Sequence, residues 1–132
     1  MATTTDLTAV EYSSPLAFQP TLDLLIATIE KAGMTVFARI DHAAGAKEAG
    51  MTMPPTVVLI YGNPKGGTPI MLASPLAALD LPLRVLVRED GSGQASISFH
   101  PIASVLRAAG VPEALATRLE PAQRLLIEAI MQ

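Results

Sequence analysis

The stretch TVVLIYGNPKGGTP, residues 56–69, decides the fold because it passes from an apolar strand into a helix. The continuous apolar run at residues 56–61 predicts a buried, central strand. A glycine-rich loop at residues 62–67 follows it. Thr68 then offers a capping hydroxyl, and Pro69 is favoured as a first helical residue. We therefore predict strand, loop and helix in that order.

Repeating patterns on both sides of this stretch predict the remaining elements. Alternation of apolar and polar residues predicts strands at 10–13, 35–41, 83–88 and 94–99, the last two forming a hairpin. Helical spacing predicts helices at 22–32, 43–49, 69–79 with a bend, 102–109 and 113–132, the last restarted or kinked at Pro121. The order predicts an α+β class: a single compact domain with a mixed or antiparallel sheet of about five strands and helices packed on it.

Length and composition limit the kind of protein. The chain has 132 residues, enough for one domain at ~150 residues per domain. Half of the residues are apolar and 16% are charged, which excludes intrinsic disorder. We expect residues 1–6 to be frayed and residues 7–132 to form the domain. No uncharged apolar run reaches the ~18 residues of a spanning helix, so we predict no membrane partner.

The kinds of residue present also limit which other partners and cofactors the protein can have. Basic residues do not cluster and aromatic residues make up only 4% of the chain, so we predict no nucleic-acid partner. The chain has no cysteine, and its two histidines lie far apart, so we predict no metal site and no cofactor. The first residues lack the pattern of a secretory signal, which predicts a cytoplasmic location.

The glycine-rich segment is the best candidate for a ligand site. Backbone amides at a helix N-terminus bind anions, and a lysine adds charge while a hydroxyl adds a hydrogen bond. We therefore predict that a small anionic ligand is held by Asn63, Lys65, Gly66, Gly67 and Thr68. The spacing fits neither a P-loop nor a dinucleotide-binding motif. The alternative is a tight connection whose glycines serve only packing.

Two residues are candidates for general acid or base catalysis, Asp80 and His42. Asp80 lies in an apolar Leu-Asp-Leu-Pro-Leu segment, where an unpaired carboxylate would be costly. A structural alternative is that backbone amides or Arg84, Lys65 or Arg39 satisfy it. An enzyme that acts on a small anionic substrate through Asp80 or His42 is thus one hypothesis.

The C-terminal helix has an unusually wide apolar surface. Its apolar residues are Leu115, Leu119, Ala122, Leu125, Leu126, Ile127, Ala129, Ile130 and Met131. Packing on the domain's own sheet would use a narrower stripe, so the width also favours contact with a second copy. The residues together favour a homodimeric, non-catalytic module for ligand binding or interaction.

Several segments in this order resemble the domain-of-unknown-function-302 family over residues 22–110. They are MTVFARIDH at 34–42, AKEAGM at 46–51, MPPT at 53–56, GNPKGGTPIM at 62–71 and LDLPL at 79–83. The resemblance implies a compact α+β fold, usually a dimer, with no established catalytic activity. Family members commonly carry a Tyr-Asn-Asp-Pro-like segment after the last strand, whereas this chain has SFHP at 98–101. Residues 113–132 lie beyond the resemblance, as a helical extension.

Overall fold

The computed structural model describes residues 6–132, so nearly all of the segment predicted to be frayed lies outside the described residues. Its five strands are β1 (Val10–Ser13), β2 (Thr35–Asp41), β3 (Thr56–Gly62), β4 (Leu83–Glu89) and β5 (Ala95–Phe99). Its helices are α1 (Phe18–Lys31), α2 (His42–Glu48), α3 (Pro64–Ala73), the 3-10 helix η1 (Pro75–Asp80), α4 (Ile102–Ala108), α5 (Glu113–Ala116) and α6 (Glu120–Ile130). The strands form one antiparallel sheet in the order β1-β5-β4-β3-β2. The predicted α+β class is confirmed.

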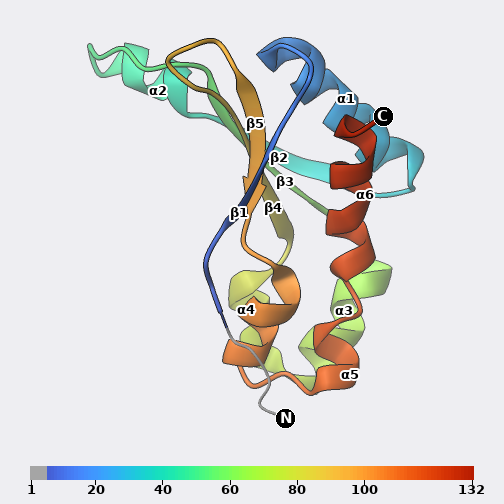
Figure 1. Ribbon diagram of the computed structural model, residues 1–132. Coiled ribbons are helices and arrows are strands. Elements are labelled where there is room, and N and C mark those ends of the chain that lie inside the picture. Colours follow the sequence, from blue (N-terminus) through green and yellow to red (C-terminus); the bar gives the residue numbers. More distant parts are fainter. Residues whose placement is uncertain (1–5) are drawn as a thin grey trace.

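Helices α1 and α6 cover one face of the sheet (Figure 1). Side chains alternate between the two faces of a strand, so every second residue points toward these helices. The buried residues of this core include Leu22, Leu25 and Ile29 of α1, Leu59 and Tyr61 of β3, Val85 and Val87 of β4, and Leu126 and Ile130 of α6. The C-terminal helix therefore packs on its own domain.

The opposite face of the sheet is more open. Strand register places Ile40, Val58 and Leu86 in one row across β2, β3 and β4. None of these three side chains is fully buried. Toward β1, Arg88 donates to Glu11 over a distance of 2.9 Å. This hydrogen bond, with a smaller contribution from the Ser98 hydroxyl, holds the pKa of Glu11 below its ordinary value.

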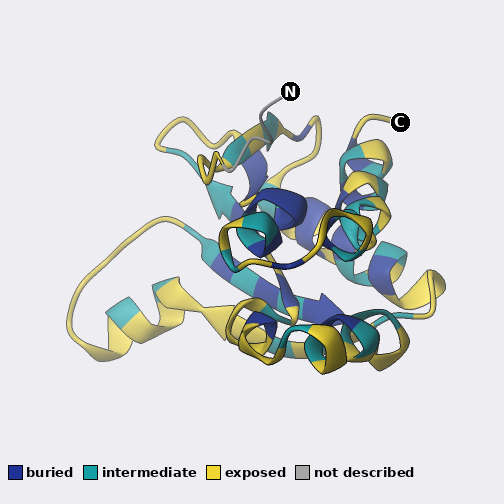
Figure 2. Cartoon of the chain, turned by 90° about the horizontal axis from the view of Figure 1, so that it is seen from below, coloured by how far each residue is buried: buried dark blue, intermediate teal, exposed yellow. Residues whose placement is uncertain are grey.

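Between β2 and β3 the chain leaves the body of the domain as an arm, residues 42–55 (Figure 2). The arm consists of α2 and a long connection, and α2 contains no buried residue. Asp41 caps this helix, since its carboxylate accepts a hydrogen bond from the Ala44 amide at 2.9 Å. Met51 and Met53 are exposed on the connection.

The largest correction to the predicted elements concerns residues 62–67, which do not form a loop. Helix α3 begins at Pro64. Asn63 is its N-cap, and its side-chain oxygen accepts from the Lys65 amide at 3.0 Å. Asparagine is a strong N-cap and proline suits the first helical position. The helix therefore starts five residues before the predicted Pro69, and Thr68 lies inside it.

Two further helix boundaries differ from the prediction. Helix α1 begins at Phe18 rather than at the predicted residue 22, and Thr21 is buried in its first turn. The Thr21 hydroxyl contacts the Ser14 hydroxyl at 2.6 Å. The predicted long C-terminal helix is two helices, because α5 ends at Ala116 and α6 starts at Glu120. Pro121 lies in the first turn of α6, so of the two predicted alternatives the helix restarts at this proline.

Candidate functional site

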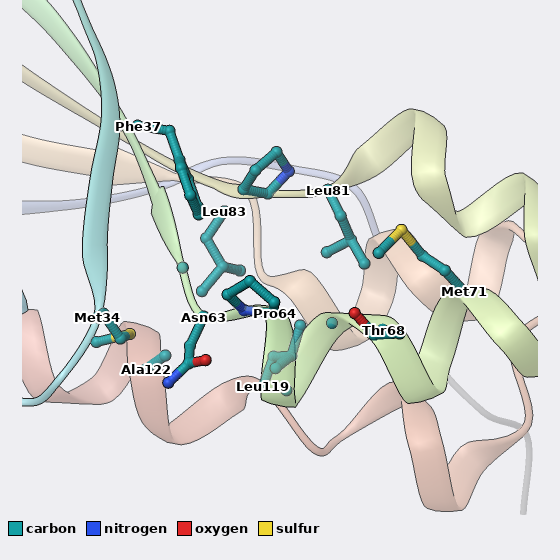
Figure 3. A pocket seen from close by; sticks show the side chains of 14 residues that line it. Met34, Phe37, Asn63, Pro64, Thr68, Met71, Leu81, Leu83, Leu119 and Ala122 are labelled. Carbon is teal, nitrogen blue, oxygen red and sulfur yellow. The ribbon is translucent and has the colours of Figure 1, made fainter.

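A cavity of about 240 Å³ lies where the end of β3, the first half of α3 and the start of α6 meet (Figure 3). Its walls are almost entirely apolar. Phe37 closes it from β2, Leu81 and Leu83 from the segment entering β4, Met71 from α3, and Leu119 from the residue before α6. Apolar concave surfaces with few polar groups are typical of small-molecule sites.

Three glycines line the cavity, and their lack of side chains keeps its space open. Gly62, Gly66 and Gly67 all line it. A Cβ at Gly67 would lie 3.8 Å from both Leu81 Cδ1 and Met71 Cε, which are themselves cavity atoms. A Cβ at Gly66 would lie only 3.1 Å from Leu119 Cδ2, which is a tight contact. The glycines therefore let α3 approach the C-terminal segment while part of the space stays open.

The polar groups at the cavity are few and mostly engaged. Asn63 donates to the Gly33 carbonyl at 3.4 Å, besides accepting from Lys65. The amides of Gly66 and Gly67 donate to the Asn63 carbonyl at 2.9 and 3.2 Å. These amides, which the sequence suggested as an anion cradle, thus have partners in their own helix. The Thr68 hydroxyl lines the cavity and has no hydrogen bond within the described residues.

Tyr61 fixes the position of α6 beside the cavity. Its side chain is fully buried, and its hydroxyl donates to the Ala122 carbonyl at 3.1 Å. Burial raises the pKa of the Tyr61 phenol well above its ordinary value, so the group stays neutral and donates. Ala122 lines the cavity, so this hydrogen bond joins β3 to the wall that α6 supplies.

Lys65 does not itself line the cavity, although its neighbours Pro64 and Gly66 do. Its side chain is exposed and forms no ion pair in the described part of the chain. Four of the five predicted ligand residues, Asn63, Gly66, Gly67 and Thr68, are therefore brought together at the cavity, and Lys65 begins beside it.

The two candidate catalytic residues lie elsewhere. Asp80 is exposed at the end of η1, so the apolar burial expected for it is wrong. It lines a separate depression with Arg84 and His100, and it forms no hydrogen bond or ion pair among residues 6–132. His42 starts α2, which lies at the opposite end of the sheet from α3 (Figure 1). Asp80, His42 and Lys65 thus do not share one cavity.

Most of the apolar wall residues carry no local signal in the sequence. Met34, Phe37, Leu81, Pro82 and Leu119 come from segments that are far apart in the sequence. Strict alternation along residues 35–41 places Phe37 on the same face as Arg39 and Asp41. In the structure a register shift between Val36 and Ala38 interrupts that alternation at Phe37. A bulge of this kind re-aims a side chain.

The class of protein follows from the fold. A crystal structure of an uncharacterized conserved DUF302 protein from Bacillus stearothermophilus matches it with a TM-score of 0.82, at 16% sequence identity. The match covers 96% of this chain and 98% of that one. Residues 10–132 also match the family described as domain of unknown function DUF302, and the chain belongs to this family. The matched range includes residues 113–132, which were predicted to be an extension.

Curated relatives are longer proteins. Fluoride-specific ion channel FluC 1 of Brucella suis is 45% identical over 94 residues, which are 71% of this chain and 37% of that protein. Fluoride-specific ion channel FluC 2 of Brucella melitensis shows the same identity over 94 residues, 35% of its length. The chain thus spans about a third of these relatives. Within residues 6–132, no helix combines the length and apolar character needed to cross a bilayer.

Proposed function

We propose that this domain is a homodimeric, non-catalytic module that binds a small organic anion. In this proposal the apolar part of the ligand lies in the cavity between α3 and α6. The observation that carries the proposal is the cavity itself, whose apolar walls are kept apart by Gly62, Gly66 and Gly67. A packed core would close such a space, because protein interiors are as dense as organic crystals.

Volume and polarity define the class of ligand. The cavity of about 240 Å³ is smaller than the ~300–1,000 Å³ of sites for drug-sized molecules. Phe37, Leu83 and Leu119 suit a short aliphatic or aromatic group. Asn63 and Thr68 offer polar contacts. Lys65, whose long side chain starts beside the cavity and has no described acidic partner, supplies the positive charge for an anionic group at the mouth.

The relatives support an accessory role. A domain that makes up about a third of proteins named as fluoride-specific ion channels is consistent with a binding module attached to another activity. Fluoride is itself a small anion, so it belongs among the test ligands beside the organic anions.

The replacement Gly67→Ala tests the cavity, with Gly45→Ala as the matched control. Both glycines lie inside helices, and neither has a positive φ, so each alanine is expected to raise the free energy of unfolding by up to about 1 kcal/mol. Only the Gly67 methyl group enters the cavity, since the Gly45 position faces open space. Gly67→Ala should therefore weaken binding of hexanoate at least threefold, measured by NMR titration, while Gly45→Ala leaves it unchanged.

The same titration separates the two parts of the ligand. Lys65→Ala should weaken the binding of hexanoate and leave the binding of hexanol unchanged, because the variant loses only the positive charge. Acetate, phosphate and fluoride serve as anions without a large apolar part and should bind more weakly than hexanoate. Equal binding of all anions by Lys65→Ala and by the unaltered chain would refute the role of Lys65. Equal binding of hexanoate by Gly67→Ala would refute the cavity.

The homodimer is supported by the open face of the sheet and by the arm. The row formed by Ile40, Val58 and Leu86 is apolar, and none of its three side chains is fully buried. Helix α2 has seven residues, none of them buried. Isolated helices shorter than ~12–15 residues are marginal in water. Contact with a second copy would cover both features.

Sedimentation velocity at micromolar concentration tests the homodimer. We expect the unaltered chain to sediment as a dimer and Ile40→Glu to sediment as a monomer, because the new charge would lie in the row that the second copy covers. Leu72→Glu, on a distant exposed surface, is the matched control and should remain a dimer. A monomeric unaltered chain at this concentration would overturn the proposal.

A further inference from the structure

The depression lined by Asp80, Arg84 and His100 is distinct from the cavity between α3 and α6. It lies where η1, the start of β4 and the start of α4 meet, and its volume is about 280 Å³. The two hollows share only Leu83 among their lining residues. Helix α4 packs against η1, so the elements that form the walls are held together. We call this hollow the η1 depression.

The floor of the η1 depression is buried and fixed. Leu83, Ile102 and Gln123 line it, and all three are buried. Both polar atoms of the Gln123 side chain are engaged, with the Ile102 amide at 2.9 Å and with the His100 carbonyl at 3.0 Å. These floor side chains therefore offer a ligand apolar surface rather than free polar atoms.

The rim of the η1 depression carries two charges of opposite sign. The side chains of Asp80 and Arg84 are exposed, and both line the depression. Within residues 6–132, neither side chain forms an ion pair or a hydrogen bond, with the other or with a third group. The two charges therefore sum to zero, yet no protein group neutralises either of them.

His100 completes the rim. Leu86 pairs with Ser98, and the same antiparallel register carried two residues further places Arg84 opposite His100. The Nδ1 atom of His100 lies 2.7 Å from the Leu7 carbonyl oxygen. Because that oxygen can only accept, Nδ1 carries the proton, and the Nε2 atom of the neutral ring keeps a lone pair. Nε2 has no hydrogen bond within the described residues, so it is free to accept one from a ligand.

We propose that the η1 depression binds a free α-amino acid with an apolar side chain. The ligand's carboxylate contacts Arg84, and its ammonium group contacts Asp80 and the Nε2 atom of His100. A simple anion is repelled by Asp80 and a simple cation by Arg84, whereas a zwitterion pairs with both charges at once. The apolar side chain of the ligand lies on the floor formed by Leu83 and Ile102.

Titration of the unaltered chain with L-leucine, followed by amide NMR, tests this inference. We expect saturable shifts at the His100 and Ile102 amides. N-acetyl-L-leucine lacks the ammonium group and L-leucinamide lacks the carboxylate, so each should bind at least tenfold more weakly, because a charge-assisted contact is lost. Glycine keeps both charges but has no side chain, and it should also bind at least tenfold more weakly. Gly67→Ala should leave L-leucine binding unchanged, which separates this site from the cavity between α3 and α6.

Two variants assign the contacts of the ligand. Asp80→Asn should weaken L-leucine binding at least fivefold without weakening that of N-acetyl-L-leucine, which has no ammonium group. Arg84→Gln should weaken L-leucine binding at least fivefold without weakening that of L-leucinamide, which has no carboxylate. The matched controls are Asp23→Asn and Arg39→Gln, which change exposed residues outside the depression and should bind like the unaltered chain.

Several results would overturn the inference. One is the absence of saturable L-leucine binding by the unaltered chain, and another is a set of shifts confined to the residues around Gly67. Binding of N-acetyl-L-leucine or L-leucinamide as tight as that of L-leucine also overturns it, because the site would then recognise one charge only. These comparisons use the unaltered chain, so they hold whether or not a variant folds. Folded Asp80→Asn and Arg84→Gln variants that bind like the unaltered chain overturn it as well.

Discussion

Replacing Leu126 with alanine is expected to lower the free energy of unfolding by about 2 to 5 kcal/mol. Leu126 lies on α6 with no exposed surface, in the core that α1 and the sheet share. Truncation removes apolar contacts and leaves a cavity that the surrounding residues cannot fully close. Urea denaturation followed by circular dichroism measures the change.

Leu72→Ala is the control for this variant, because Leu72 is also a helical leucine but is 79% exposed. Its effect should stay within about 0.5 kcal/mol, as for most surface substitutions. If Leu126→Ala were no more destabilising than Leu72→Ala, α6 would not be part of the core. The expected difference would establish that residues 113–132 belong to the folding unit.

Gln123→Leu is expected to destabilise the domain by about 2 to 5 kcal/mol. The Gln123 side chain is buried and joins two segments, since its oxygen accepts from the Ile102 amide at 2.9 Å and its amide group donates to the His100 carbonyl at 3.0 Å. A leucine side chain can form neither hydrogen bond, so the Ile102 amide and the His100 carbonyl both lose their partner. A buried group left without a hydrogen bond costs about 1–3 kcal/mol, which applies in full to the Ile102 amide and in part to the partly buried His100 carbonyl. Equilibrium denaturation measures the loss.

Gln19→Leu provides the comparison, because Gln19 is an exposed helical glutamine that bonds only Asp23 at 2.9 Å. Its effect should stay within about 0.5 kcal/mol. Hydrogen exchange adds a local readout, since loss of the Gln123 contact should speed exchange at the Ile102 amide, the first helical N–H of α4. Unchanged stability and unchanged exchange in Gln123→Leu would contradict this role.

The strands were predictable because their signal is local. Alternation along residues 83–88 follows directly from the twofold repeat of a strand. Residues 35–41 carry the same signal, although the register shift interrupts it at Phe37. Gly33, which follows α1, has the positive φ of 81° that suits a residue just after a helix. The start of α3 was also within reach. Asn63 followed by Pro64 is a favourable helix start, but Gly66 and Gly67 suggested a loop.

The cavity and the cap of α4 could not be predicted in the same way. The Ile102 amide donates its hydrogen bond to Gln123, 21 positions later in the chain, so no local sequence pattern predicts this cap. Phe37 reaches the cavity through a register shift that depends on pairing with β3. Four predicted ligand residues do meet at the cavity, whereas its mostly apolar character arises from residues that only the folded chain brings together.

The order of strands in the sheet has a consequence for synthesis of the chain. Edge strand β1 pairs with β5, so Val10 lies opposite Phe99. As the chain leaves the ribosome, β1 therefore cannot pair until most of the domain, including β5, has been translated. The apolar side of α1 waits longer still, because α6 is the last helix to appear. Contacts so distant in sequence slow folding, and the nascent chain would expose Leu22, Leu25 and Ile29 to chaperones until translation nears residue 130.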